Sequence, residues 1–345
     1  MGKIKLAIMI DKPMLERTIS PEDMAWLREF AEIVNEGTYP DKIDCVYMKE
    51  HLPKAEACFT CWGTPPFTKE ILDQAPNLRV ILHGAGTPKA IVTDAVWERG
   101  IRVATAAPVI AIDVAETALG GMIYCLKRFR EFESIMREGR WSKQNMAENP
   151  VDAVKPHIWR LNWMLTVGII SASHVGKNMI RFLKPFGVNI LLYDPCVSRR
   201  AAEEMGVTLC SLDELMSQSH VVSIHAPKLP ETDKLINAEN LKLVRDNGLI
   251  VNTSRGSVID EPALIAELQS GRLNAYLDVY EQEPPAPDNP LLKLPNVLIT
   301  PHISGGHTVN GGFERGSYIV NQLFSFAGTG TLRDETIAAM LPGMA

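Results

Sequence analysis

Short apolar runs alternate with helical patterns along almost the whole chain. The runs are rich in Val, Ile and Leu, and they include KLAIMI, RVILHG, TVGIIS, NILLYD, HVVSIHA, GLIVNTS, NAYLDV and NVLITPH. In the stretch DEPALIAELQS, apolar residues recur at helical spacing, with Asp260 as an N-cap and Gly271 as a stop. Strands that are nearly all apolar and are separated by helices form parallel sheets covered on both faces. The alternation therefore predicts an α/β fold built on parallel sheets.

Length and charge narrow the class of protein. A chain of 345 residues is long enough for two domains. Its formal net charge of -6 at pH 7 supplies no basic surface for nucleic acid. We find no apolar run that would cross a bilayer, and the start, MGKIKLAIMIDK, predicts a strand rather than a secretory leader. We therefore expect a cytoplasmic protein with neither a nucleic-acid nor a membrane partner.

The six cysteines are scattered, which is typical of reduced thiols in a chain without a leader. Cys58 and Cys61 have the CxxC spacing of redox and zinc sites. No second pair accompanies them in the sequence, so we expect no metal, and the redox or zinc interpretation stays open as an alternative.

The stretch VGIISASHVGK has the outline of a dinucleotide-binding turn between a strand and a helix. It keeps only the third glycine of the G-x-G-x-x-G pattern, Gly176, which allows the helix to pack closely on the strand. Ser171 and Ser173 stand at the first two glycine positions. A left-handed conformation costs a residue other than glycine about 1–2 kcal/mol, and a side chain at the second position narrows the approach to the pyrophosphate.

The hydroxyl of Ser173 could in turn bond a phosphate oxygen, and a helix N-terminus favours phosphate by itself. Taken alone, the stretch also fits plain packing of a strand on a helix. We expect a weakened but working phosphate site at Ser173, His174, Val175 and Gly176.

Residues at the ends of two further strands are expected to contribute to the same cofactor site. NILLYD ends in Asp194, which is placed to accept hydrogen bonds from the adenosine ribose and favours NAD over NADP. Arg199 and Arg200 follow closely, so NADP remains an alternative. His225 and Ala226 follow another strand and are expected to border the cofactor.

Polar residues also follow three later strands. Thr253 and Arg255 come after GLIV, Asp278 and Glu283 come after NAYL, and His302 comes after the run that contains LIT. In open α/β sheets, ligands bind at the carboxyl ends of the strands. We therefore expect an arginine, a carboxylate and a histidine at one edge of one sheet.

With these segments in place, the chain resembles the NAD-dependent, D-isomer-specific 2-hydroxyacid dehydrogenase family. Matching blocks are RFLKPFGVNILLYDP, HAPKLPETDKLINAENLKLVRDNGLIVNTSRGSVIDEPALIAELQSGRL, LDVYEQEPP and LITPHI. The resemblance covers nearly the whole chain and is most specific from Leu165 to Ile303. It implies that Arg255 binds the substrate carboxylate and carbonyl, and that Glu283 partners an acid/base His302. It also implies that Asp278 holds the nicotinamide carboxamide.

The chemistry of 2-oxo acid reduction also favours these residue types, independently of the resemblance. The reaction needs a hydride on the carbonyl carbon and a proton on its oxygen. A histidine can deliver that proton near neutral pH, and a glutamate beside it fixes the ring. An arginine presents a planar, charged fork to a carboxylate and stabilises charge that develops on the ketone oxygen. The cofactor supplies the hydride.

The resemblance implies two Rossmann-like, doubly wound parallel-sheet domains. The NAD-binding domain, residues 114–304, would be inserted into a flavodoxin-like substrate domain of residues 1–113 and 305–345. Asp113 and Ser304 would lie near hinges, and closure would exclude water. A homodimer is also implied, with the helix VAETALGGMIYCLKRF at the contact, although its pattern alone permits a core within one chain.

The first domain departs from the family pattern. Gly84, Ala85 and Gly86 keep a glycine-rich turn but lack the Asp-Asn pair that usually follows. Backbone N–H groups there can still bind a substrate carboxylate. The departure argues against the familiar small substrates, and Trp62 and Trp141 are candidates to line a pocket for something bulkier.

The sequence thus predicts an enzyme that interconverts a 2-hydroxy acid and a 2-oxo acid with NAD. Three alternatives stay open. One is a glyoxylate or hydroxypyruvate reductase that prefers NADPH, which turnover with the two cofactors would identify. Another is a cofactor-sensing regulatory protein like the corepressors of this fold, against which NADH oxidation would count. The third is a former dehydrogenase that no longer binds dinucleotide, so that NADH fluorescence would not change on titration.

Overall fold

The computed structural model describes residues 2–141 and 149–344. The chain divides into two compact units, which are treated separately below. Unit 1 is Met1–Asp113 with Gly305–Met344, and unit 2 is Val114–Ser304. The polar composition of residues 139–155 predicts a surface excursion. This segment includes residues 142–148, which lie outside the described residues.

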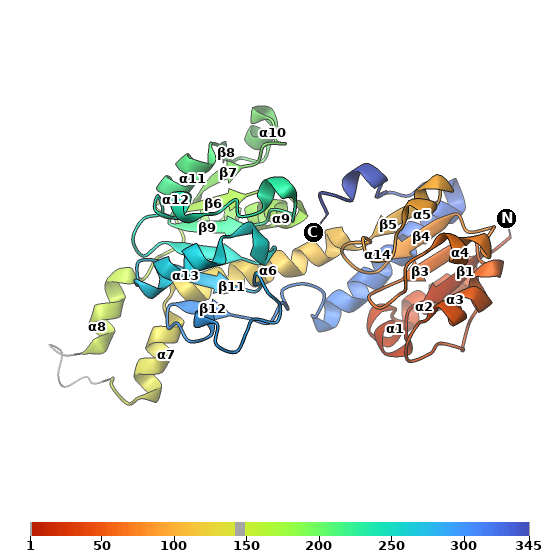
Figure 1. Ribbon diagram of the computed structural model, residues 1–345, viewed down its shortest axis with the longest axis horizontal. Helices are drawn as coiled ribbons and strands as arrows, with labels where there is room; N and C mark the ends of the chain where they lie inside the picture. The colour runs from red at the N-terminus through yellow and green to blue at the C-terminus, as the bar shows by residue number, and fades with distance from the viewer. Residues whose placement is uncertain (1, 142–148, 345) are drawn as a thin grey trace. The chain divides into compact units, whose positions relative to one another are not determined.

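Unit 1 is built on a parallel sheet with strand order β2-β1-β3-β4-β5 (Figure 1). This is the order of flavodoxin-like doubly wound sheets, as predicted. The strands are β1 (Ile4–Met9), β2 (Ala31–Ile33), β3 (Ala57–Thr60), β4 (Val80–His83) and β5 (Arg102–Thr105). The helices are α1 (Lys12–Thr18), α2 (Pro21–Phe30), α3 (Cys45–His51), η1 (Leu52–Lys54), α4 (Lys69–Asp73), α5 (Asp94–Glu98), α14 (Val309–Thr329) and η8 (Ala338–Met340).

Helix α14 belongs to unit 1 although it follows unit 2 in the chain. Its Ile319 is buried in the core cluster that also contains the inward side chains of β1 and β3. Gly312 and Gly316 face α1, where a Cβ would lie 2.1 Å from the backbone oxygen of Arg17 and 1.7 Å from that of Thr18. Only glycine therefore lets these two helices pack so closely.

Unit 2 is built on a parallel sheet with strand order β12-β11-β10-β9-β6-β7-β8. Its central part follows the Rossmann order, and the order reverses between β6 and β9, where dinucleotides bind in such sheets. The strands are β6 (Thr166–Ile170), β7 (Asn189–Tyr193), β8 (Thr208–Leu209), β9 (Val221–Ile224), β10 (Leu249–Asn252), β11 (Asn274–Leu277) and β12 (Val297–Ile299).

Unit 2 also contains a series of helices besides α6 (Ala107–Leu126). They are α7 (Phe129–Arg137), α8 (Pro150–Val154), η3 (Lys155–His157), α9 (His174–Leu183), η4 (Lys184–Phe186), α10 (Arg199–Glu204), α11 (Leu212–Gln218), η5 (Pro230–Thr232), α12 (Ala238–Leu241), η6 (Gly256–Val258), α13 (Glu261–Gln269) and η7 (Pro290–Leu292). As predicted, Asp260 caps α13 by accepting a hydrogen bond from the N–H of Ala263, and Gly271 follows its end with φ +77°.

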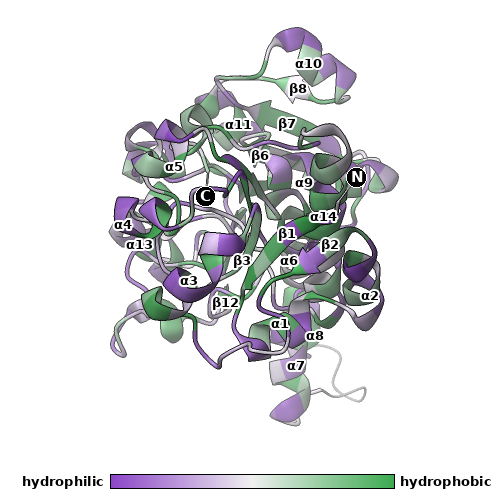
Figure 2. Ribbon diagram, turned by 90° about the vertical axis from the view of Figure 1, so that its right-hand side faces the viewer, coloured by the Kyte–Doolittle hydropathy of each residue, from purple (hydrophilic) through white to green (hydrophobic). Residues whose placement is uncertain are grey.

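The predicted apolar runs all form strands, whereas the short strands β2, β3, β5 and β8 lie outside those runs. Figure 2 colours β1 and β3 as hydrophobic, while the outer helix α10 is largely hydrophilic. This contrast follows from burial, since β3 is covered on both faces: every residue of the strand is buried.

Helix α6 (Ala107–Leu126) begins in unit 1 and continues into unit 2. Among the described residues it is long and apolar enough to cross a membrane by length and composition alone, a test that buried core helices also pass. Ala118, Met122 and Leu126 lie in a core cluster of unit 2. One face of α6 is therefore part of that core.

Candidate active site

The turn between β6 and α9 keeps the backbone shape of a dinucleotide fingerprint. Ser171, at the first glycine position, has φ +75°, so the predicted left-handed strain is present. A Cβ on Gly176 would lie 2.0 Å from the backbone oxygen of Ser171. The third position therefore accepts no side chain without movement of the turn.

The hydroxyl of Ser173, at the second position, makes two hydrogen bonds within the protein. Its hydroxyl oxygen accepts a hydrogen bond from the N–H of Gly176 at 3.3 Å and caps α9. Its hydroxyl proton is donated to the backbone oxygen of His225 at 2.9 Å. A hydroxyl has one proton to donate, so the suggestion that Ser173 donates to a phosphate oxygen does not fit this geometry. His174 and Val175, the first residues of α9, are the remaining parts of the helix N-terminus.

Asp194 follows β7 and shapes the same turn. One carboxylate oxygen accepts from the N–H of Ala172 and the other from the N–H of Cys196, both at 2.8 Å. Each oxygen has further capacity to accept, because an ionised carboxylate offers about four lone-pair sites. Asp194 is only half-buried, so a ribose hydroxyl can reach the remaining sites.

Two buried polar atoms near this edge have no partner among the described residues. They are Nδ1 of His225, after β9, and Oγ1 of Thr253, after β10. Burial lowers the pKa of His225 to about 3, so its ring is neutral, and Ser223 pairs with its other nitrogen at 3.0 Å. Ala226, beside it, is also buried. Unsatisfied buried groups are costly, and a polar ligand bound along this edge fits them; these residues are compatible with a dinucleotide.

His302 and Glu283, for which the sequence predicts an acid/base role and a partner role, are in contact in unit 2. The Nδ1 atom of His302 and Oε2 of Glu283 are 2.6 Å apart, and the second oxygen of Glu283 accepts from the N–H of Tyr280 at 3.1 Å. The side chains of His302 and Glu283 are 46% and 36% exposed. The glutamate thus fixes the imidazole through one nitrogen and leaves the other accessible.

Asp278 organises the segment that carries the histidine. Its backbone oxygen accepts from the N–H of His302 at 2.9 Å. Its fully buried carboxylate accepts from the N–H groups of Ile303 and Ser304, at 3.0 and 2.9 Å, and from the hydroxyl of Thr300. These bonds hold His302 at φ +53°. The predicted contact of Asp278 with the nicotinamide carboxamide stays a prediction.

Arg255 follows β10 and is partly buried. Burial lowers its pKa, and the nearby negative charge of Glu283 opposes that shift. The next residue, Gly256, packs against the backbone of the Tyr280 segment, where a Cβ would lie 1.9 Å from the carbonyl of Tyr280. Arg255 and the His302–Glu283 pair therefore lie at one edge of the second sheet, as the strand pattern predicted.

The glycine-rich turn expected to bind substrate lies in unit 1, after β4. The N–H of Gly84 donates to Thr60 at 2.7 Å, and the oxygen of Ala85 accepts from Ala106 at 3.0 Å. The N–H groups of Ala85 and Gly86 have no acceptor among the described residues. His83, which no sequence signal marked, supports the turn: its Nδ1 hydrogen-bonds with the Thr60 hydroxyl at 2.9 Å.

The CxxC pair does not form a site in this fold. Cys58 is buried in one core cluster of unit 1 and Cys61 in another, because residues three apart on a strand point to opposite faces. Burial raises the pKa of both thiols, that of Cys61 to about 11.

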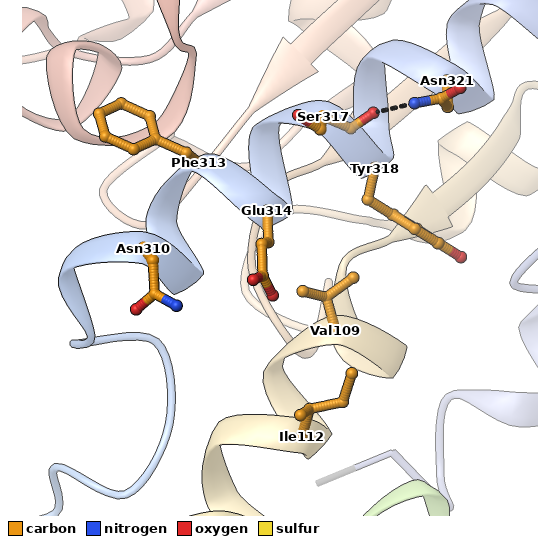
Figure 3. Close-up of a pocket in the computed structure, with 8 residues that line it drawn as sticks. All are labelled: Val109, Ile112, Asn310, Phe313, Glu314, Ser317, Tyr318 and Asn321. Carbon is orange, nitrogen blue, oxygen red and sulfur yellow. Dashed lines mark hydrogen bonds between the residues drawn. The ribbon is translucent and has the colours of Figure 1, made fainter.

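A hollow of about 450 Å³ lies in unit 1 between the start of α6 and α14 (Figure 3). It contains none of the predicted site residues and is lined by Val109, Ile112, Asn310, Phe313, Glu314, Ser317, Tyr318 and Asn321.

Residues 119–304 match the family model described as "D-isomer specific 2-hydroxyacid dehydrogenase, NAD binding domain". The chain belongs to this family. It is 34% identical over 240 residues to a glyoxylate reductase of Korarchaeum cryptofilum, covering 69% of this chain and 70% of the relative. It is 32% identical over 294 residues to a D-3-phosphoglycerate dehydrogenase of Archaeoglobus fulgidus, covering 85% of this chain and 53% of that relative.

The chain thus spans about half the length of the D-3-phosphoglycerate dehydrogenases it matches. Solved structures confirm the fold. A phosphoglycerate oxidoreductase from Rhizobium etli has a TM-score of 0.77 at 24% identity, covering 96% of this chain and 98% of that chain. D-2-hydroxyisocaproate dehydrogenase has a TM-score of 0.76 at 21% identity, covering 96% and 99%. Both the predicted family and the two parallel-sheet domains are therefore correct.

Proposed function

We propose that this protein interconverts a 2-hydroxy acid and a 2-oxo acid with NAD. The observation that carries the proposal is the 2.6 Å contact between Nδ1 of His302 and Glu283, at the sheet edge that also bears Arg255. An arginine, an imidazole and a carboxylate in this arrangement supply what carbonyl reduction needs: a bound carboxylate, a proton donor and a fixed orientation for that donor.

In the reduction direction, the guanidinium of Arg255 binds the substrate carboxylate and polarises the ketone oxygen. The exposed nitrogen of His302, Nε2, gives its proton to that oxygen, while Glu283 holds the ring and stabilises the positive charge before transfer. In the oxidation direction, the same nitrogen removes the hydroxyl proton. The turn Gly84–Gly86 is the part of unit 1 that we propose for binding the carboxylate, through the N–H groups of Ala85 and Gly86.

NAD, when bound, supplies or accepts the hydride. We assign the phosphates to the N-terminus of α9 (Ser173–Gly176), the ribose to Asp194, and the nicotinamide side to His225, Ala226, Thr253 and Asp278. The family model names this domain as NAD-binding. Asp194 favours NAD over NADP, because a ribose phosphate would meet its negative charge. The ratio of kcat/KM with NADH to that with NADPH tests this choice, and a ratio below one would contradict it.

A His302→Asn variant tests the catalytic assignment. We expect kcat with any 2-oxo acid substrate to fall by about 100-fold or more, with NADH affinity unchanged. The matched control is His157→Asn, because His157 is an exposed histidine of the same unit and should keep full activity. If His302→Asn retained wild-type turnover, the proposed mechanism would be wrong.

We also propose a cytoplasmic homodimer that assembles through α6 and its surroundings. Large apolar side chains of unit 2 are exposed in this region, namely Phe129, Met136, Trp163 and Met164 at 50–72%. Gly120 of α6 is exposed, and a Cβ added to it would have open space around it, with nothing within 4 Å. A Gly120→Arg substitution should leave the subunit folded and yield a monomer by light scattering. If the wild-type protein were a monomer, the proposed homodimer would be wrong, but the proposed reaction would not be contradicted.

A further inference from the structure

Arg315 of α14 is a buried cation without an acidic partner at ion-pair distance among the described residues. It is 2% exposed. Its Nη1 donates to the backbone oxygen of Gly306 at 2.9 Å, while its buried Nε has no acceptor. Burial lowers the pKa of Arg315, and electrostatic interaction with Cys61 and Asp113 opposes that shift only in part. The edge of the guanidinium formed by Nε and Nη2 is therefore uncommitted.

Trp62 lies against this cation. The guanidinium carbon is 4.6 Å from the centre of the Trp62 ring, and the ring itself is 41% exposed, so it lies between the cation and water. The ring of His307 is nearly parallel to that of Trp62, with centres 6.4 Å apart. An aromatic face stabilises a cation but accepts no conventional hydrogen bond from Nε. The fork that arginine presents to an anion is thus held in a place of low dielectric.

The cation adjoins the turn proposed for the substrate carboxylate. Trp62 follows Cys61 at the end of β3, and the Cys61 thiol donates to the backbone oxygen of Gly84 at 3.4 Å. Thr18 borders the same turn: its methyl carbon lies 3.7 Å from where a Gly84 Cβ would stand, and its buried hydroxyl is close to the Cys61 thiol. The uncommitted edge of the Arg315 guanidinium therefore lies beside segments at the carboxyl edge of the first sheet, where ligands bind in such sheets.

We propose that Arg315 and Trp62 form a subsite for a second anionic group of the substrate, a distal carboxylate or phosphate. This inference rests on the proposed function, because it names the substrate class of the same reaction: 2-oxo acids with an anion at the far end. The anion accepts two charge-assisted hydrogen bonds from Nε and Nη2. Trp62 shields the pair from water, which strengthens the attraction.

The test compares substrates that differ only at the far end. One pair is 2-oxoglutarate and 2-oxopentanoate, and the other is 3-phosphohydroxypyruvate and hydroxypyruvate. In the wild-type protein we expect kcat/KM for one dianion to exceed that of its partner by about 10–100-fold, because hydrogen bonds to a charged group stabilise a complex by about that factor. The pair with the larger ratio identifies carboxylate or phosphate. Arg315→Gln should reduce that ratio to about one through a higher KM for the dianion, because the distal contact is made before and during the reaction.

Arg17→Gln is the matched control, since Arg17 is an exposed arginine of the same unit, and its ratio should stay at the wild-type value. A wild-type ratio of one or less in both pairs, or an unchanged ratio in Arg315→Gln, overturns the proposal. If Arg315→Gln does not fold by circular dichroism, Arg315→Lys decides: it keeps the charge but loses the fork, so the ratio must fall. An unchanged ratio in that variant likewise overturns the subsite.

The proposed function and the subsite can fail separately. If no 2-oxo acid is reduced, the proposed function is wrong, and calorimetric titration with glutarate and with inorganic phosphate tests the subsite alone. Binding that Arg315→Gln (or Arg315→Lys) weakens at least tenfold and Arg17→Gln does not supports an anion subsite. Absence of such binding overturns it.

Discussion

Replacing the two serines of the β6–α9 turn with glycine should change the stability of unit 2 in opposite directions. Ser171 has φ +75°, and this conformation costs about 1–2 kcal/mol in a residue with a Cβ. Glycine removes that cost. It also increases the conformational entropy of the unfolded chain, which lowers the free energy of unfolding by about 0.4–1 kcal/mol. At the midpoints of these two ranges, Ser171→Gly should therefore stabilise unit 2 by about 0.8 kcal/mol, or roughly 2–3 °C in Tm for a unit of this size.

Ser173→Gly should instead destabilise the unit. It removes the hydroxyl that donates to the buried backbone oxygen of His225, a loss of about 1 kcal/mol. Glycine is a passable N-cap, so the lost bond to Gly176 adds only a few tenths of a kcal/mol. The sum is about 1–1.5 kcal/mol, or roughly 3–5 °C lower in Tm. The same change widens the approach to the pyrophosphate, so the affinity for NADH should rise.

Thermal unfolding of each variant measures the first effect, and the transition of unit 2 is identified as the one that NADH moves upward. A fluorescence titration with NADH measures the second. Shifts of the same sign in the two serine variants would refute the assignment of strain to Ser171 and of capping to Ser173. Tighter NADH binding in Ser171→Gly but not in Ser173→Gly would show that the first position, and not the second, restricts the phosphates.

Three further outcomes follow from the same structure. Gly256→Ala should cost unit 2 more than about 3 kcal/mol and reduce turnover by displacing Arg255, as thermal unfolding and steady-state assays would detect. Glu283→Gln should lower kcat by about 10–100-fold while shifting Tm by less than about 2 °C, since only the charge is removed. His83 is buried, and burial lowers its pKa from 6.5 to about 4, so between these values the unfolded chain binds more protons. The stability of unit 1 should therefore fall as the pH drops from 6.5 to 4, by up to about 3 kcal/mol, and His83→Gln should flatten that dependence in thermal unfolding.

The grouping of the candidate site residues at one sheet edge could be predicted because backbone bonding continues past the ends of the strands. The N–H of Asp278 donates to Asn252 at 3.0 Å, and the N–H of His302 donates to Asp278 at 2.9 Å. The residues that follow β11 and β12 are thus still paired with their neighbours at the end of β10 and after β11. A sequence that marks three adjacent parallel strands therefore also marks which residues follow them at one edge, so Arg255, Glu283 and His302 could be predicted to lie there together.

Contacts that join residues distant in the sequence could not be predicted in this way. The Ser173 hydroxyl donates a hydrogen bond to a backbone oxygen 52 residues away. The hydrogen bond between His83 and Thr60 joins two strands through their side chains alone. Asp278 illustrates the same limit: its carboxylate accepts from a segment about 25 residues further on. Residue type and spacing leave each of these choices open, because a buried serine or histidine has several acceptors within reach.

The pattern of retained and lost glycines in the β6–α9 turn has a steric explanation. At Gly176 a Cβ would lie 2.0 Å from the backbone oxygen of Ser171, so a side chain there requires the helix to move away from the strand. At position 171 the requirement is only a left-handed backbone, which serine adopts at a cost of about 1–2 kcal/mol. At position 173 the serine even gains two hydrogen bonds. Loss of the first two glycines is therefore compatible with an intact dinucleotide turn, whereas loss of the third would not be.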